Sequence, residues 1–448
     1  MKRWLRMAAA GAALLMGAAG LTGCSGGSGQ SGGGDDEKTV LKISFFKGGY
    51  GDEWLKAITA AYTKEHPNVT FDLEGDADMT LKIGPRLESG ANLPDIAMVL
   101  ATNWQQWAAK GYLEDLSDVY AADVDGTAMA DKIIEADRNV GKYGGKYWMV
   151  PWTDVCNGII YNETLFAQNG WSEPKTVSEM FTLMEQMKAK GVTPFSFGGK
   201  VISYWDFPVL AWWAQAEGMD GMQTFLKMDS PEVYNQQGRL KALEVFEKII
   251  KDKTNYVDGA MGMDHIQSQM AFLQGKAAMI PMGAWMETEM KNSIPEGFKM
   301  KMMLTPALDG AKMTDVSVCT SQDMIFIPKK AKNVEVAKDF LKFMARDDML
   351  KLYTEKTGSP RPFTYDIASI TGLSDFSNNI LDLWSKANKV YMYSESPIYF
   401  MKYYYWPAAG TPYSRIQIGD ETAAETFSND YAFAKSKWDA TKKELGLD

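Results

Sequence analysis

The sequence predicts an α/β fold in which an open, doubly wound sheet flanked by helices is followed by a second α/β region. An opening strand–helix–strand pattern is the first observation behind this prediction. The second is the nearly continuous apolar run at 95–100, which is typical of a buried parallel strand. The third is that strands and helices alternate again over 155–318. Such alternation favours parallel sheets whose right-handed crossovers cover both faces.

The elements of the first region follow from hydrophobic periodicity. Leu41, Ile43 and Phe45 recur at every second residue, as in a strand, and the next apolar residues recur at helical spacing until Pro67. Gly84-Pro85 predicts a bend or an interruption in the helix that contains it. In order, we expect a strand at 40–46, a helix at 52–65, a strand at 69–73, a helix at 77–88 and a strand at 95–100.

The second region shows the same two periodicities. In order, we expect a strand at 158–161, a helix at 177–190, a strand at 194–197, helices at 240–251 and 266–273, and a strand at 277–280. A third block then begins with a strand at 324–327. The helix behind that strand places Val336, Phe340 and Met344 on one face.

Polar or glycine-containing segments end three of the expected parallel strands. They are Phe46-Lys47-Gly48-Gly49, Glu74-Gly75-Asp76 and Thr102-Asn103-Trp104. Ligands of open α/β sheets bind beyond the carboxyl ends of the strands, so we expect a binding site where these segments meet. The glycines do not have GxGxxG spacing, which argues against a dinucleotide fingerprint.

The charge of the chain argues against two classes of partner. The formal net charge is −10, and removal of Lys2, Arg3 and Arg6 with the N-terminal segment takes it to −13. An acidic protein is a poor match for nucleic acid and for a polybasic contact with a membrane. Tryptophan is abundant at 14 residues, more than a core of this size needs.

Cysteine and histidine are too scarce for several chemistries. The cysteines are Cys24, Cys156 and Cys319, with no CxxC pair, and the histidines are His66 and His265, with no HExxH motif. A zinc site is therefore not expected, and we expect no cofactor. The GxxxxGK[ST] motif of ATP-binding loops is also missing from the sequence.

The N-terminal segment has the features of a secretion signal. A positive start precedes an apolar stretch at 7–21, which as a helix would span roughly 20 Å of the ~30 Å hydrocarbon core. Leu21-Thr22-Gly23-Cys24 then resembles the lipobox of bacterial lipoproteins, whose cysteine is diacylated and becomes the first residue. The resemblance implies a signal peptide at 1–23, a Gly/Ser-rich tether at 24–38, and membrane attachment through the lipid alone. A soluble secreted protein that happens to carry Cys24 is the alternative.

Four further segments, in order, resemble the bacterial extracellular solute-binding proteins, the family that includes the maltose-binding protein. Leu93-Pro94-Asp95-Ile96 with the segment 107–116 resembles an early strand and helix of that family. Val150-Pro151-Trp152 before 158–162 resembles its first crossing between lobes. The segment 272–279 followed by Gly283-Ala284-Trp285 is the most specific match, and 323–330 resembles the return to the first lobe. The resemblance covers essentially the whole mature chain.

The resemblance implies a two-lobed periplasmic-binding-protein fold, with an open doubly wound sheet in each lobe and hinge crossings between them. Lobe 1 would hold 39–153 and 320–370, and lobe 2 would hold 154–319 and 371–448. A monomer of this kind closes on a ligand and docks on a permease that has a separate ATPase. Cys156 and Cys319 would lie on neighbouring crossings, and whether they are bonded stays open.

A sugar site needs aromatic plates for stacking and planar polar groups for paired hydrogen bonds. Aromatic residues crowd 391–406, where packing in the core or between lobes is the alternative explanation. The candidate ligand-binding residues are Phe46, Lys47, Asp76, Asn103, Trp104, Trp152, Asn157, Trp205, Trp212, Trp285, Glu287, Tyr404 and Trp406.

We therefore expect an extracytoplasmic substrate-binding lipoprotein of an ABC transporter that captures a carbohydrate, in particular an oligosaccharide, and is not an enzyme. A binder of a non-sugar solute is the first alternative, since Glu74, Asp76 and Asp78 would suit a polyamine and a peptide is also open. A carbohydrate-active enzyme is the second, because carboxylates are numerous enough for a glycosidase pair. No nucleophile elbow or metal motif supports that second alternative.

Overall fold

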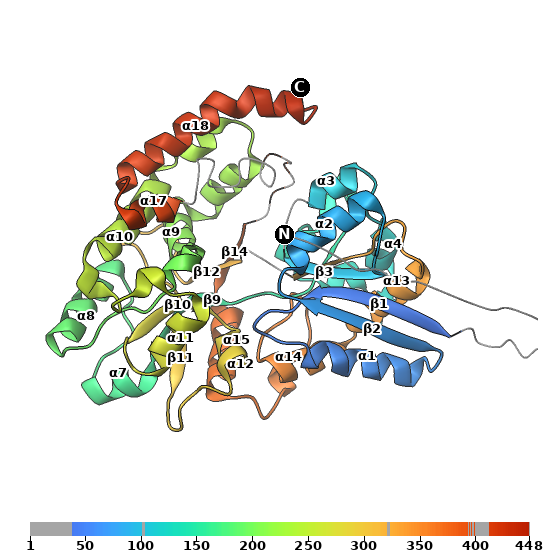
Figure 1. Ribbon diagram of the computed structural model, residues 1–448, viewed down its shortest axis with the longest axis horizontal. Coiled ribbons are helices and arrows are strands. Elements are labelled where there is room, and N and C mark those ends of the chain that lie inside the picture. Colours follow the sequence, from blue (N-terminus) through green and yellow to red (C-terminus); the bar gives the residue numbers. More distant parts are fainter. Residues whose placement is uncertain are drawn as a thin grey trace, which may run out of the picture. The chain divides into compact units, whose positions relative to one another are not determined.

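The first sheet has five strands in the order β2-β1-β3-β13-β8 (Figure 1). The computed structural model describes residues 38–100, 104–319, 323–392, 394, 396, 398 and 412–447. The strands are β1 (Thr39–Phe46), β2 (Val69–Asp76), β3 (Ile96–Leu100), β8 (Val150–Pro151) and β13 (Asp323–Phe326). β1 pairs in parallel with β2 and β3, whereas β13 is antiparallel to both β3 and β8. The four strands expected in this region are confirmed.

Both faces of this sheet are covered. Ile96 and Met98 of β3 belong to one hydrophobic cluster, and Ala97 and Val99, which alternate with them, belong to another. The first cluster includes residues of α1, α13 and α14, and the second includes residues of α2 and α3. Figure 1 shows α1 and α2 on opposite faces of the sheet. The helices are α1 (Glu53–Glu65), α2 (Met79–Ser89), α3 (Trp104–Ala109), α4 (Ser117–Ala121), α5 (Met129–Lys132), α6 (Glu135–Arg138), α13 (Val334–Met344) and α14 (Asp347–Thr357).

Helix α2 continues through Gly84-Pro85, so the predicted interruption is wrong. Pro85 removes one amide hydrogen from the helix. Met79, Ile83 and Leu87 are nevertheless buried on one side of α2, and this packing holds the helix together. The helix ends at Gly90, which has the left-handed φ of 69° that glycine adopts without strain.

The second sheet is built around β9 (Asn157–Asn162), all of whose residues are buried. β10 (Met279–Gly283) and β11 (Met300–Met303) flank it, and both are antiparallel to it. The predicted strand at 194–197 is wrong. Phe195 makes single bridges to two different neighbours, Tyr256 and Met279, and these residues form no continuous ladder with either.

Two hydrophobic clusters join the helices of this second region to its sheet. The helices are α7 (Glu163–Asn169), α8 (Val177–Ala189), α9 (Asp206–Lys227), α10 (Gln237–Lys251), α11 (His265–Leu273), α12 (Met286–Met290), α15 (Asp375–Lys386), α17 (Pro412–Ile418) and α18 (Ala423–Glu444). The chain also forms two short hairpins. One pairs β4 (Asp123–Val124) with β5 (Thr127–Ala128), and the other pairs β6 (Lys142–Tyr143) with β7 (Lys146–Tyr147). Within the described residues, none of the helices combines the length and apolar character that crossing a membrane requires.

The chain passes between the two sheets more than once. Residues 152–156 join β8 of the first sheet to β9 of the second. A second passage runs from β12 (Val316–Cys319) to β13, and β12 pairs with β14 (Asn388–Tyr391). Residues 358–374 lead from α14 to α15. The exact lobe boundaries given above stay a prediction.

Cys156 lies on the first of these passages as a free thiol. It is fully buried, with its sulfur 3.9 Å from Sδ of Met302. Burial raises the pKa of this thiol to about 12, so it is unreactive at neutral pH. The side chain of Cys319 lies outside the described residues, so its distance from Cys156 stays open.

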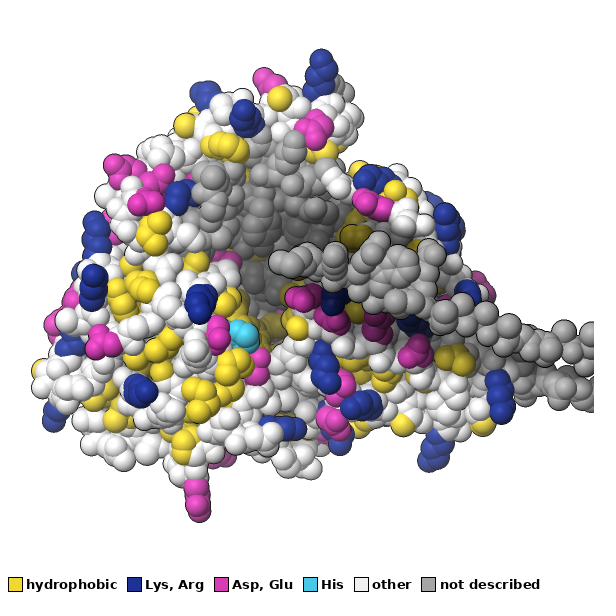
Figure 2. All heavy atoms as spheres, viewed as in Figure 1, with side chains coloured by type: hydrophobic (Ala, Val, Ile, Leu, Met, Phe, Trp, Pro, Cys, Tyr) yellow, Lys and Arg dark blue, Asp and Glu magenta, His cyan; other side chains and the backbone are white. Residues whose placement is uncertain are grey.

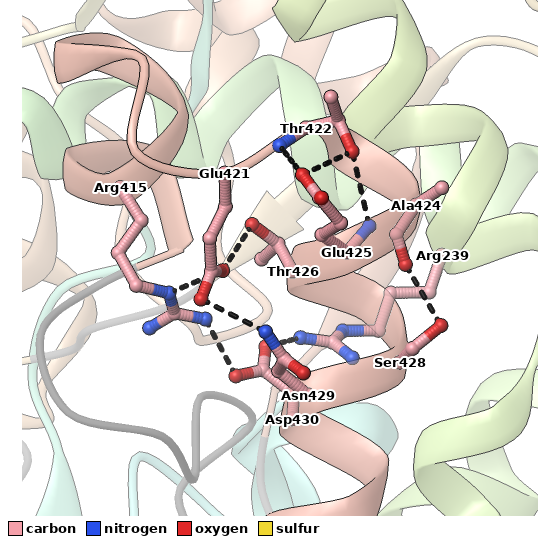
Figure 3. Close-up of polar contacts among 10 residues, drawn as sticks. All are labelled: Arg239, Arg415, Glu421, Thr422, Ala424, Glu425, Thr426, Ser428, Asn429 and Asp430. Carbon is pink, nitrogen blue, oxygen red and sulfur yellow. Dashed lines mark hydrogen bonds and ion pairs between the residues drawn. The ribbon is translucent and has the colours of Figure 1, made fainter.

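A buried network of charges fastens the C-terminal helices to the second region (Figure 3). Asp430 of α18 accepts hydrogen bonds from Arg239 of α10 and, at 2.7 Å, from Arg415 of α17. Arg415 also donates to Glu421 at 2.7 Å. Thr422 caps α18 through a reciprocal capping box. One carboxylate thus joins α17 and α18 to α10, which is distant from them in the sequence.

Candidate binding site

Five strand ends meet at one edge of the first sheet. β1 ends at Phe46, β2 at Asp76 and β3 at Leu100, and parallel pairing aligns these three ends. β13 is antiparallel and places Asp323 opposite Leu100, so it begins at this edge. β8 ends there as well, at Pro151. This is the edge at which open α/β sheets bind ligands.

The loop that follows β1 reaches a residue of the second region. A Cβ atom on Gly49 would lie 2.6 Å from Cδ1 of Trp285, so only glycine allows the backbone this close approach. Trp285 follows β10 of the second sheet. Phe46 and Lys47, which open the loop, are partly or fully exposed, and Lys47 forms an ion pair with Asp52 at 2.9 Å. The structure therefore brings three predicted site residues, Phe46, Lys47 and Trp285, into one neighbourhood.

Trp285 is the centre of a small group of rings, which we call the aromatic cluster: Tyr204, Phe207, His265 and Trp285. The ring centroids of Tyr204 and Phe207 lie 5.9 and 5.8 Å from that of Trp285. The ring of His265 lies 6.4 Å from that of Tyr204. Phe207 is buried, and the other three are partly exposed. Rings with an apolar face and a polar edge are suited to the C–H faces and hydroxyls of a sugar.

A second group of side chains lies where the passages between the sheets meet, and we call it the crossing cluster: Tyr50, Trp152, Asp323, Tyr353 and Arg361. The hydroxyls of Tyr50 and Ser359 lie 2.9 Å apart. The Arg361 guanidinium lies over the Trp152 ring and 4.9 Å from the centre of the Tyr353 ring. Burial raises the pKa of Asp323 to about 7, against the opposing field of Arg361.

Two of the three carboxylates that would suit a polyamine, Glu74 and Asp76, already have cationic partners. Glu74 accepts two hydrogen bonds of 2.7 Å from Arg86, which hold the pKa of Glu74 at about 2. Asp76 is paired with Lys82, and this hydrogen bond lowers the pKa of Asp76. On the face in Figure 2, basic and acidic side chains are interspersed and form no continuous basic band among the described residues.

Four predicted tryptophans lie inside the hydrophobic clusters. Trp104, Trp152, Trp205 and Trp212 are each at most 1% exposed in this structure. Trp212 donates its indole N–H to the carbonyl of Pro306 at 3.0 Å. In this arrangement these rings present no surface to a ligand.

Asn157 and Glu287 hold segments of the chain together. The Asn157 amide donates to the carbonyl of Val318 at 3.0 Å, which ties β9 to β12. Glu287 accepts hydrogen bonds from Ser374 at 2.6 Å and Ser377 at 3.0 Å, at the start of α15. The predicted residues Asn103, Tyr404 and Trp406, and the predicted lipidation residue Cys24, lie outside the described residues.

Sequence reasoning missed Tyr50, Asp323 and Arg361, as well as the Tyr204 and His265 that flank Trp285. Asp323 was missed because β13 runs antiparallel, so its amino end reaches the site. Tyr204 and its neighbour Trp205 lie on the 3₁₀ helix Gly199–Trp205, where Tyr204 is partly exposed and Trp205 is buried. Among the described residues, no group of three or more metal-ligating side chains occurs at this site or elsewhere.

The fold defines the class of protein. The structure superposes with a TM-score of 0.72 on a protein from work on xylan utilization by Caldanaerobius polysaccharolyticus, at 18% identity over 88% of this chain and 99% of that chain. A Listeria monocytogenes ABC substrate-binding protein in complex with cycloalternan gives a TM-score of 0.69, at 17% identity over 92% and 100% of the two chains. This is the two-lobed fold of solute-binding proteins.

The chain belongs to the bacterial extracellular solute-binding proteins, because the model of that family matches residues 48–351. It is 26% identical to the diacetylchitobiose binding protein NgcE of Streptomyces coelicolor, over 68% of this chain and 66% of that protein. It is also 26% identical to the multiple sugar-binding protein of Streptococcus mutans, over 69% of this chain and 72% of that protein.

Proposed function

We propose that this protein captures a saccharide at the sheet edge described above and delivers it to the permease of an ABC importer. The observation that carries the proposal is the contact of the Gly49 loop with Trp285, which joins the ligand-binding edge of the first sheet to the aromatic cluster. A sugar ring stacked on Trp285 would reach the polar groups of both regions. The names of the relatives, which bind diacetylchitobiose and multiple sugars, support the same ligand class.

The charges at the site support a saccharide over a polyamine. Glu74 and Asp76 are already neutralised by Arg86 and Lys82, and Lys47 at the same edge is paired with Asp52. A polycation would have to displace these partners. An uncharged polyol needs only hydrogen-bond donors and acceptors, which the site supplies.

We further propose that the protein binds the saccharide without changing it chemically. We also propose that a lipid anchors the protein. The family consists of substrate-binding proteins, and saccharide capture needs only stacking and hydrogen bonds. The lipobox-like Leu21-Thr22-Gly23-Cys24 supports anchoring at the outer face of the cell membrane, with the Gly/Ser-rich tether holding the folded part away from the lipid.

A thermal-shift screen tests the proposed ligand class. The mature protein is heated with diacetylchitobiose, raffinose, acarbose or xylo-oligosaccharides, and with spermidine and a short peptide as controls. A saccharide at a concentration 100 times its Kd should add about 2.7 kcal/mol to the unfolding free energy by mass action. A shift with spermidine or the peptide and none with any saccharide would contradict the proposal.

A further inference from the structure

Asp323 is held in place by hydrogen bonds to its backbone, while its carboxylate accepts none from the described residues. Its amide donates to the Thr153 hydroxyl at 2.9 Å, and its carbonyl accepts from the Trp152 amide at 2.7 Å. These bonds fix the backbone between two passages of the chain. The carboxylate is partly exposed at the ligand-binding edge, and it has no hydrogen-bond partner among the described residues. Its two oxygens are therefore available to a ligand.

Arg361 supplies a positive charge that acts on this carboxylate without forming a direct ion pair with it. Its side chain is 0% exposed, and its three guanidinium nitrogens have no hydrogen-bond partner among the described residues. A buried charge without a partner is strongly destabilising, so a counter-charge is needed. Among the carboxylates of the described residues, Asp323 is the one that acts electrostatically on Arg361.

The other titratable groups around the pair are three phenols and, acting on two of them, the buried carboxylate of Asp154, which accepts hydrogen bonds from Trp384 and Tyr391. Tyr50 from the loop after β1, Tyr353 of α14 and Tyr365 beyond it face the two charges, and burial raises the pKa of each of these phenols. Although Asp323 keeps some exposed surface, desolvation by the side chains packed around it raises the pKa of its carboxyl to about 7, and Arg361 opposes this shift. The carboxylate is therefore largely ionised at pH 8 and largely protonated at pH 6.

We propose that Asp323 is a specificity-determining residue whose carboxylate accepts hydrogen bonds from two adjacent hydroxyls of an uncharged saccharide, with Arg361 as its positioning residue. An ionised carboxylate only accepts hydrogen bonds, and its two oxygens match a pair of neighbouring donors. When the carboxylate is ionised, the pair of Asp323 and Arg361 carries no net charge, so an uncharged ligand does not disturb it. This inference rests on the proposed function and deepens it.

The test measures saccharide binding by titration calorimetry between pH 6 and pH 8. The probe is whichever of diacetylchitobiose, raffinose, acarbose and the xylo-oligosaccharides the wild type binds most tightly. Asp323→Asn keeps the shape and removes the charge, and we expect it to weaken binding at pH 8 by about tenfold or more, as for a lost charge-assisted hydrogen bond. Asp72→Asn, an exposed aspartate on the same sheet, should bind as the wild type does.

The pH profile separates this role from a structural one. Wild-type affinity should fall by about tenfold from pH 8 to pH 6 as the carboxylate is protonated, and Asp323→Asn should show a flat profile. Arg361→Lys should retain the profile, whereas Arg361→Gln should move its midpoint to higher pH. The wild-type profile needs no variant, so a folding defect in either substitution leaves the test decisive.

Failure of this inference can be distinguished from failure of the proposed function. If the wild type binds a saccharide while Asp323→Asn binds it equally well at pH 8, or if wild-type affinity is independent of pH, the inference is overturned and the proposed function stands. If the wild type binds no saccharide, the proposed function fails and the inference fails with it.

Discussion

Gly49 and Trp285 show how single residues connect the two regions of this chain. The backbone of Gly49 lies so close to the indole that any side chain would displace the ring or the loop. The indole in turn rests edge-on against Tyr204 and Phe207, which fix its orientation. A ring that is held on several sides and still partly exposed loses little freedom when a ligand stacks on it.

Replacement of Trp285 by alanine should weaken saccharide binding by about 1–3 kcal/mol, the usual loss for a buried aromatic anchor, while the fold persists. Titration calorimetry measures the change. Trp171→Ala is the matched control, because Trp171 is also partly exposed but packs against Phe166 outside the aromatic cluster. Wild-type affinity in Trp285→Ala would remove this residue from the site.

The residues of the site could be predicted only in part. Phe46, Lys47 and Trp285 could be predicted from the sequence. The first two lie at the end of an expected strand, and Trp285 lies in a segment that resembles the family. Trp205 was chosen on its chemistry, yet it packs against Phe195 and Phe246 in the core. Composition cannot distinguish a ring on the core side of a helix from one on the exposed side, because that depends on which way the helix is turned.

At the scale of elements, a charged junction joins α10, α17 and α18. Asp430 is fully buried and receives two guanidinium groups, from Arg239 and Arg415. Charges buried in this way are stable only as a set, since each would be uncompensated without the others. The junction therefore fixes α18 against the second region.

Asp430→Asn should lower the free energy of unfolding by about 3–5 kcal/mol, because it removes the carboxylate that the buried Arg239 and the partly buried Arg415 share. Urea denaturation followed by circular dichroism measures the loss. The control is Asp439→Asn, at an exposed position of the same helix, which should change stability by less than about 0.5 kcal/mol. A wild-type midpoint for Asp430→Asn would contradict the importance of the junction.

Elements with clear periodicity were predictable, whereas the segment 194–197 was not. The expected helix at 52–65 and strand at 40–46 match α1 and β1 within one residue at each end. Residues 194–197 have the composition of a strand, but whether a ladder forms depends on partners such as Tyr256 that are far away in the sequence. The antiparallel direction of β13, which brings Asp323 to the site, is likewise a tertiary property.

At the scale of the whole molecule, the proposed anchor and the binding site are separable. The tether at 24–38 is rich in glycine and serine, and such chains transmit no fixed orientation. Cys24→Ser should therefore release the protein into the medium without changing its affinity for a saccharide. Fractionation of cells with calorimetry of the released protein checks both parts. A variant that stays in the membrane fraction would contradict the lipobox interpretation.

The central claim is that this chain binds a saccharide and releases it unchanged. Titration calorimetry of the wild-type protein with the saccharide found by the thermal-shift screen, followed by chromatography of the recovered sugar, tests it most directly. We predict one binding site per chain and full recovery of the intact saccharide. No heat of binding with any saccharide, or a shortened sugar after incubation, would contradict the account.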